Sequence, residues 1–395
     1  MEPLEVFRKM SLSSDIIKKS QQHHHHHDHD HSEKKETSAR TVSAAEQAKK
    51  YYRPAAERLR IILMFLLCIL TFGLPTGIGE TAQFLCGFVP MAFFILSGYF
   101  VLREDAERPA RILRTVKRTA IAFAVMFVGY LIVNLIAYAV DGESILAVLT
   151  SGKFWFDFLV LNLWQLKIGK LIWYVQALLY GYVIILLLEK AKLMKLDWVI
   201  AVLCLILNAC SGEFSGVLGF SFAGYGHLPE NFVTFALPFL LIGGFVHRKI
   251  NFFFKIHRIW YWIVLVLGLG AALVERSLLG KLGFPGYYSS TVGTALAALA
   301  VCLITFKADR KRKGFETTLG FSRQETNLVY FLCEAVGYFV ILLFSGVVKL
   351  LNVYEGELVV ANLSGVIGII SFVLCFLIAL AASRIRESKT GVSED

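Results

Sequence analysis

The chain repeatedly enters long apolar runs that are separated by short polar connections. A helix of about 20 apolar residues is long enough to cross the hydrocarbon core of a bilayer, where no water satisfies an open backbone. Hydrophobic residues make up 56% of the chain and charged residues only 18%, against about 25% charged in ordinary soluble domains. A soluble core has no use for so many runs of this length, so the sequence predicts an all-α, polytopic membrane protein.

We expect about ten transmembrane helices, all of them after Arg58. The predicted ranges are 61–78, 84–102, 116–140, 171–189, 197–211, 231–247, 258–275, 286–306, 327–350 and 359–382. Residues 1–55 are polar, and we expect a disordered tail there, because too little apolar surface is available to offset the entropy of ordering. The prediction divides the chain into this tail, a transmembrane domain at 56–384 and a second tail at 385–395.

Basic residues predict how the helices are oriented. With the N-terminus inside, the inner connections are 103–118, 189–197, 247–258 and 307–327, which carry six, three, four and six Lys or Arg. The outer connections are poorer in both, as the positive-inside rule requires. An even number of spans then places both termini in the cytoplasm of a multi-pass plasma-membrane protein. This distribution accounts for the net charge of +10 without a nucleic-acid partner.

One further apolar stretch does not fit a span. Residues 153–164 read KFWFDFLVLNLW, which is too short to cross a bilayer. Tryptophans are enriched at membrane–water interfaces, so Trp155 and Trp164 favour an interfacial or re-entrant segment.

Several stretches together resemble the acyltransferase 3 family of integral-membrane O-acyltransferases. FVPMAFFILSGYFVL at 88–102 is similar to that family's second span and is followed by a similar basic run. KLIWYVQALLYGYVII at 170–185, ENFVTFALPFLLIGGFVHRK at 230–249 and LGFSRQETNLVYFLCEAV at 319–336 resemble later segments. The resemblance covers roughly residues 56–384, and the order and spacing of the stretches carry it.

The resemblance implies transfer of an acyl group, commonly acetyl from acetyl-CoA, to a hydroxyl of a cell-envelope polysaccharide or another surface molecule. Such chemistry needs a base for the hydroxyl proton and positive charge near the phosphates of the donor. The implied partners are acyl-CoA, the hydroxyl acceptor and membrane lipid.

The chain departs from the family pattern at two positions. The family's first span carries an Arg and, eleven positions later, a His, but counting from Arg60 gives Thr71 and counting from Arg58 gives Ile69. The late His of the family is replaced by Cys333. The expected catalytic His is therefore absent.

Five arginines are the candidates for binding the donor's phosphates. Arg111, Arg114 and Arg118 share one helix face by their spacing of three and four residues. Arg58 and Arg60 stand at the start of the first span. The alternative for all five is anchoring at the cytoplasmic interface.

Three residues are candidates for the missing base or nucleophile. Glu334 stands inside a predicted span, where a carboxylate is costly enough to suggest a function; its alternative role is pairing with Arg323 or Arg118. Cys333 is a candidate acyl-carrying nucleophile, and His227 lies in an outer connection that an acceptor glycan would reach. Glu275 also lies near a span but has water and Arg276 beside it.

Two other groups complete the candidate sites. Ser97, Tyr99 and Trp173 are expected to shape a pocket, or to serve helix packing, where small residues are common. The tract HHHHHDHDH offers imidazoles for adventitious Zn, Ni or Cu, or is neutral low-complexity sequence. Its histidines are His23, His24, His25, His26, His27, His29 and His31.

Two alternative functions remain beside an active acyltransferase. A catalytically degenerate relative would keep the fold and act as a binding or scaffold component, as the absent His suggests. A cation transporter would need polar or acidic ligands at mid-membrane, and the predicted spans supply few.

Overall fold

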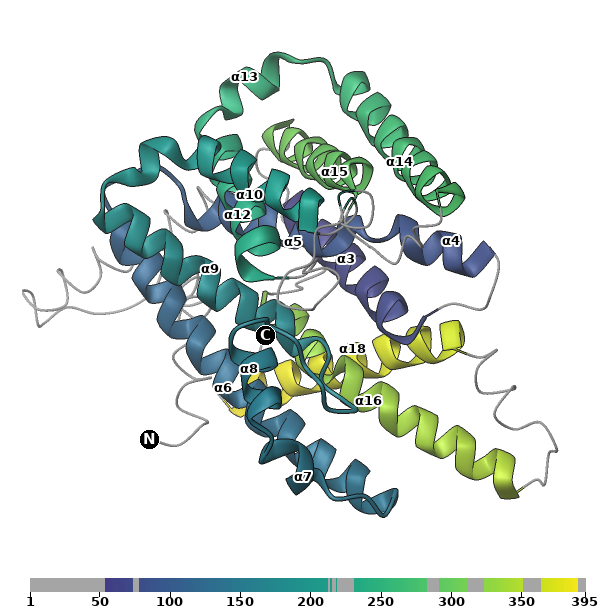
Figure 1. The fold of residues 1–395 in the computed structure, drawn as a ribbon. Coiled ribbons are helices and arrows are strands. Elements are labelled where there is room, and N and C mark those ends of the chain that lie inside the picture. Colours follow the sequence, from purple (N-terminus) through teal and green to yellow (C-terminus); the bar gives the residue numbers. More distant parts are fainter. Residues whose placement is uncertain are drawn as a thin grey trace, which may run out of the picture.

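The computed structural model describes residues 54–73, 78–211, 214, 218, 231–282, 291–311, 323–350 and 364–389, and every element in these ranges is helical (Figure 1). The longer α-helices are α3 (Pro54–Phe72), α5 (Phe88–Val101), α6 (Arg108–Val140), α9 (Ile172–Lys190), α10 (Asp197–Ser211), α12 (Leu237–Arg248), α14 (Arg258–Lys281), α15 (Val292–Lys311), α16 (Arg323–Leu350) and α18 (Ser364–Lys389). Shorter elements are α4 (Ile78–Leu85), α7 (Ile145–Leu149), α8 (Gly152–Leu159), η1 (Leu193–Leu196), the π-helical turn η2 (Phe232–Ala236) and α13 (Ile250–Lys255).

Seven helical stretches in the described ranges are long and apolar enough to cross a membrane. They are Gly79–Val101, Arg108–Val140, Ile172–Lys190, Leu193–Ser211, Arg258–Lys281, Val292–Asp309 and Asn327–Phe344. Shorter apolar helices occupy Phe232–Arg248 and Val366–Ala382. These helices confirm an all-helical membrane protein, and each of the ten predicted ranges overlaps a helix. The predicted tail at 1–55 lies almost wholly outside the described residues.

The helix boundaries differ from the predicted ones for local reasons. The first span was expected at 61–78, but α3 begins at Pro54, whose fixed φ suits the first turn of a helix. It ends before Gly73, whose φ of +77° is the left-handed conformation that closes helices. Helix α18 continues to Lys389, past the expected start of the C-terminal tail at 385.

Helix α5 forms the centre of the protein. It packs against α12, α15 and α3, and α3 in turn contacts α16 and α18 (Figure 1). Most of its side chains are buried, including Phe94 and Ile95, because neighbours cover it on several sides. A helix that is apolar all round is expected in such an interior position.

A close helix contact joins α5 to α12 through glycine. A Cβ added at Gly98 would lie 2.0 Å from the carbonyl oxygen of Leu240, and one added at Gly243 would lie 2.2 Å from that of Ile95. The two backbones therefore meet where neither helix has a side chain, as at other small-residue contacts between membrane helices.

Other helices expose apolar side chains around this centre. Val128 and Ile132 of α6 and Val266 and Leu267 of α14 are exposed, in windows apolar enough to span a membrane. Lipid is the environment that suits these surfaces. Helix α6 has 33 residues, more than the roughly 20 that a bilayer core requires, so its basic first turns extend beyond the apolar part.

The segment between α6 and α9 turns back into the protein. Helix α8 has only eight residues, in agreement with the prediction that 153–164 does not span, and Phe154 and Phe158 are buried. The connection that follows is tied to α6, because the side chain of Asn134 donates to the carbonyl oxygen of Ile168 at 2.6 Å and accepts from its N–H at 3.0 Å. Trp164 donates to the same carbonyl oxygen at 2.7 Å.

Candidate functional site

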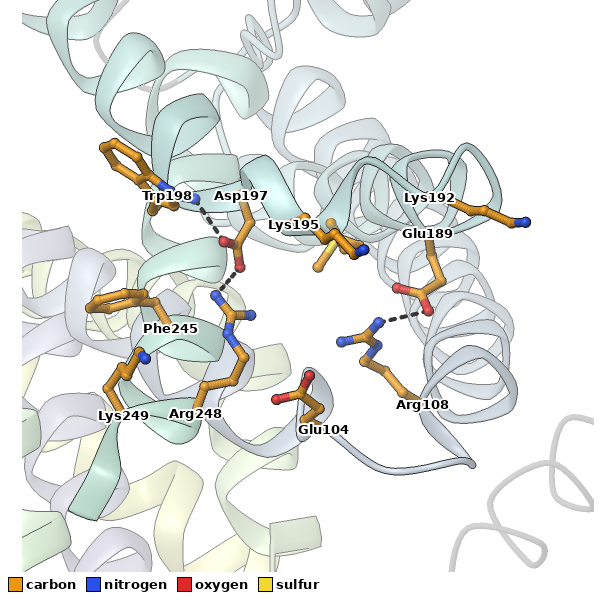
Figure 2. Close-up of a pocket in the computed structure, with 11 residues that line it drawn as sticks. Glu104, Arg108, Glu189, Lys192, Lys195, Asp197, Trp198, Phe245, Arg248 and Lys249 are labelled. Atoms are coloured by element: carbon orange, nitrogen blue, oxygen red, sulfur yellow. Dashed lines mark hydrogen bonds and ion pairs between the residues drawn. The ribbon is translucent and has the colours of Figure 1, made fainter. Parts of the chain in front are cut away.

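A cavity of about 740 Å³ opens where α6 begins, α9 ends, α10 begins and α12 ends (Figure 2). These four helix ends belong to three of the connections that are rich in Lys and Arg. The volume lies within the range of about 300–1,000 Å³ that is usual for small-molecule sites. The lining residues are Glu104, Arg108, Glu189, Lys192, Met194, Lys195, Asp197, Trp198, Phe245, Arg248 and Lys249.

One side of the cavity is fixed by an ion pair between α12 and α10. Arg248 Nη2 pairs with Asp197 Oδ2, and the other oxygen of Asp197 accepts the N–H of Trp198 at 2.7 Å. Asp197 is the first residue of α10, where a carboxylate complements the helix dipole. Arg248 also lies over the ring of Phe245, 5.9 Å from its centroid.

The opposite side carries a less complete pair. Arg108 Nη2 donates to Glu189 Oε1 at 2.8 Å, which joins the start of α6 to the end of α9 (Figure 2). Arg108 Nε and Glu189 Oε2 are buried and have no hydrogen-bond partner. An arginine and a carboxylate often form two parallel bonds, but here they form one.

The five arginines predicted to bind a donor do not line this cavity. Arg111 holds the turn between α5 and α6, donating to the carbonyl oxygens of Val101 and Arg103 and to the carboxylate of Asp105. Arg60 pairs with Glu57 at 2.5 Å and lies over the ring of Phe100. The side chains of the remaining three, Arg58, Arg114 and Arg118, are exposed. Their donor role stays a prediction.

The turn held by Arg111 gives a prediction about pH. Hydrogen bonds from Arg111 and then Arg103 lower the pKa of Asp105 to about 2, whereas an unfolded chain has about 3.9. The stabilisation from this carboxylate is therefore complete above about pH 4 and lost as the pH falls through 2. We expect Asp105→Asn to lower the free energy of unfolding by about 0.5 kcal/mol at pH 7, a small effect because solvent screens the pair. Unfolding in detergent from pH 7 to pH 2 measures whether the two proteins converge; a gap that widens toward acid would contradict this account.

Glu334 lies far from the cavity, and its carboxylate accepts hydrogen bonds from the backbone just before α9. Its Oε1 accepts the N–H groups of Gly169 and Lys170 at 2.8 and 2.9 Å, and its Oε2 accepts that of Leu171 at 3.0 Å. Only 6% of the residue is exposed. The carboxylate thus satisfies backbone donors at the start of a helix, where the dipole favours negative charge.

Neighbouring side chains support the same connection. Tyr330, one turn before Glu334 on α16, donates its hydroxyl to the carbonyl oxygen of Leu171. Tyr130 of α6 donates to the carbonyl oxygen of Phe331 at 3.2 Å. Cys333 is fully buried. Glu334 therefore belongs to a structural hydrogen-bond network, and Cys333 is its buried neighbour in the chain.

Helix α9 separates Glu334 from the cavity. Glu334 binds the residues just before α9, and Glu189 stands at the other end of this 19-residue helix. At 1.5 Å per residue the two sites are about 27 Å apart. The structure does not bring the predicted base and the cavity cations into one site.

The predicted pocket-shaping residues pack in the interior. Tyr99 stacks on Phe306 with ring centroids 3.8 Å apart and meets His247 at 5.0 Å. Trp173 contacts Phe235 at 5.9 Å, and Ser97 is half-buried on α5. His227 and the seven histidines of the N-terminal tract lie outside the described residues. Within the described ranges, no three His, Cys, Asp or Glu side chains are grouped to hold a metal.

Sequence reasoning missed the cations that do line the cavity. All five lie in the predicted inner connections: Arg108, Lys192, Lys195, Arg248 and Lys249. Their position at helix ends was a usable signal, but the pattern of charge does not say which helix ends meet.

Comparison with models of protein families, with curated proteins and with solved structures finds no match to this chain.

Proposed function

We propose that the chain is a ten-span plasma-membrane protein with both termini in the cytoplasm, and that it transfers an acyl group from acyl-CoA to a hydroxyl of a cell-surface glycan. The topology is supported by the overlap of each of the ten predicted ranges with a helix and by the basic connections. In this orientation the cavity of about 740 Å³ faces the cytoplasm, where acyl-CoA is available.

The observation that carries the proposal is the lining of this cavity. Five basic side chains surround it against three acidic ones, and Trp198 and Phe245 add aromatic surface. Phosphates are attracted by clustered Lys and Arg, and an adenine ring stacks well on aromatic side chains. The family resemblance of residues 56–384 supports the acyl-transfer chemistry. Glu334, Cys333 and His227 remain the candidates for the catalytic group.

A binding or scaffold component of the same fold is the second candidate function. Both oxygens of Glu334 already accept backbone N–H groups, which leaves this carboxylate less free to take a proton from an acceptor. The missing His of the first span points in the same direction.

Acyl transfer is tested directly with the purified full-length protein and labelled acetyl-CoA. We expect label to reach the hydroxyls of envelope glycan, and free CoA to be released at a matching rate. Protein unfolded by heat is the blank, and base-labile recovery of the label as acetate identifies an O-ester. A cooperatively folded sample that neither transfers label nor hydrolyses acetyl-CoA with a broad set of glycans would favour the scaffold.

A further inference from the structure

The connection between α12 and α14 carries large apolar side chains that the rest of the protein leaves uncovered. Its short helix α13 lies at the edge of the helix bundle (Figure 1). Of the three consecutive phenylalanines in α13, Phe253 and Phe254 are half-buried, whereas Phe252 is 61% exposed. At the start of α14, Ile259 and Trp260 are 53% and 58% exposed. Aromatic side chains at the end of a membrane helix are typical of the headgroup region, where one side is apolar and the other is wet.

Hydrogen bonds from two neighbouring helices hold α13 in place. Tyr261 of α14 donates its hydroxyl to the carbonyl oxygen of Phe253 at 2.5 Å. Lys307 of α15 donates its ammonium group to the carbonyl oxygen of Phe254 at 3.2 Å and to that of Ile256. These bonds satisfy carbonyl groups at the end of α13 that have no partner within the helix. The exposed side chains of α13 therefore belong to an ordered segment, and their exposure is a fixed feature of this surface.

The same connection is basic and carries no carboxylate of its own. Lys249, Lys255 and Arg258 are exposed, and no Asp or Glu occurs at 231–274. Within the part of the chain that the structure describes, no ion pair joins any of these three cations to a carboxylate. Three positive charges without an ion-pair partner thus share one short connection with the exposed apolar side chains.

We infer that this surface, which we call the α13 patch, binds the headgroups of anionic phospholipids. The patch consists of Lys249, Phe252, Lys255, Arg258, Ile259 and Trp260. Apolar side chains of a segment that lies along the membrane surface enter the boundary between headgroups and acyl chains, while Lys and Arg beside them attract anionic lipid. The connection 247–258 carries four Lys or Arg directly before α14, an arrangement through which membrane helices recruit such lipids.

The position of the α13 patch favours lipid over an acidic protein as its occupant. Helix α14 is apolar enough to cross a membrane and exposes Trp262 and Val266, so the lipid that surrounds this helix also reaches the patch at its first turn. A neutral lipid would cover the apolar side chains but would leave the three cations without a counter-charge. The inference requires no acyl transfer, because Lys249 is the one residue of the patch that also lines the cavity.

Lipid binding is measured on the full-length protein in nanodiscs of phosphatidylcholine that contain a trace of photoactivatable phosphatidylglycerol. Peptide mapping locates the crosslink, and competition by added phosphatidylglycerol or phosphatidylcholine gives the lipid preference of the natural chain. The test variant is Lys255→Gln with Arg258→Gln, which removes two charges of the patch. The control is Lys117→Gln with Lys190→Gln, which removes two exposed lysines of α6 and α9 that lie outside the patch and do not line the cavity.

We expect the crosslink to lie within 249–262 and to be competed by phosphatidylglycerol but not by phosphatidylcholine. The affinity for the probe should fall about tenfold in the test variant, because each Lys or Arg near the surface strengthens the attraction, and it should not change in the control. Equal competition by the two lipids would overturn the inference and leave the patch to neutral lipid or to a protein partner. A crosslink spread evenly over the other basic connections, or a test variant that binds like the control, would also overturn it. The competition uses the natural chain, so it decides the question even if the test variant fails to fold.

Discussion

Replacing Gly98 by alanine is expected to lower the free energy of unfolding by about 3 kcal/mol or more, which is the upper end of the usual cost of overpacking an interior. The added methyl group would lie 2.0 Å from the carbonyl oxygen of Leu240, and that atom belongs to the backbone of α12. A side chain could rotate away, but a helix backbone must move as a body. Because α5 is the central helix, its displacement from α12 also disturbs the contacts with α15 and α3.

Gly129→Ala is the matched control for this change. Gly129 lies on α6, and a Cβ added there meets no atom within 4 Å. Alanine in a helix is favoured over glycine by about 0.5–1 kcal/mol, so this variant should be as stable as the natural chain or slightly more stable. Denaturant titration in detergent compares the two variants. Equal unfolding midpoints would mean that α5 and α12 are not in close contact.

Replacing Glu334 by glutamine is expected to lower the free energy of unfolding by about 2–4 kcal/mol. The carboxylate accepts three backbone N–H groups with two oxygens, whereas an amide keeps one oxygen and turns an NH₂ donor toward the remaining N–H. Hydrogen bonds to a charged group contribute about 1.5–3 kcal/mol, and a buried donor without a partner adds its own cost. The amides of Gly169, Lys170 and Leu171 should then exchange with solvent faster.

Glu107→Gln is the control, because Glu107 is a carboxylate with 69% of its side chain exposed and only a 3.6 Å pair with Arg114. It should change stability by less than about 1 kcal/mol. Hydrogen exchange and unfolding together separate the two roles considered for Glu334. A purely chemical role would remove acyl transfer while leaving both measurements unchanged, and that result would contradict the structural role described here.

The parts of the fold that depend on local sequence were predictable. Apolar length predicted the helices, since each helix satisfies its backbone within its own segment. Helix α3 begins at Pro54 and ends before Gly73, and both residue types mark helix ends in a sequence. The short α8 followed from the length of its apolar run.

The site depends on contacts between distant segments, and there the sequence was insufficient. Arg108 and Glu189 are 81 positions apart, and nothing in either neighbourhood identifies the other as a partner. Glu334 was recognised as an unusual intramembrane carboxylate. Its hydrogen-bond donors, however, are backbone N–H groups, which have no sequence signature. Arg111 was predicted to bind the phosphates of the acyl-CoA donor. In the structure its guanidinium is hydrogen-bonded within the turn between α5 and α6.

The anchoring of α9 by Glu334 has a consequence for the order of synthesis. Leu171 leaves the ribosome 163 residues before Glu334, which at about 5–20 residues per second is a delay of roughly ten to thirty seconds. During that interval the N–H groups ahead of α9 lack their final acceptor. The nascent chain therefore completes the anchoring of α9 only when α16 enters the membrane. A chain terminated before α16 would reach the bilayer without this anchor.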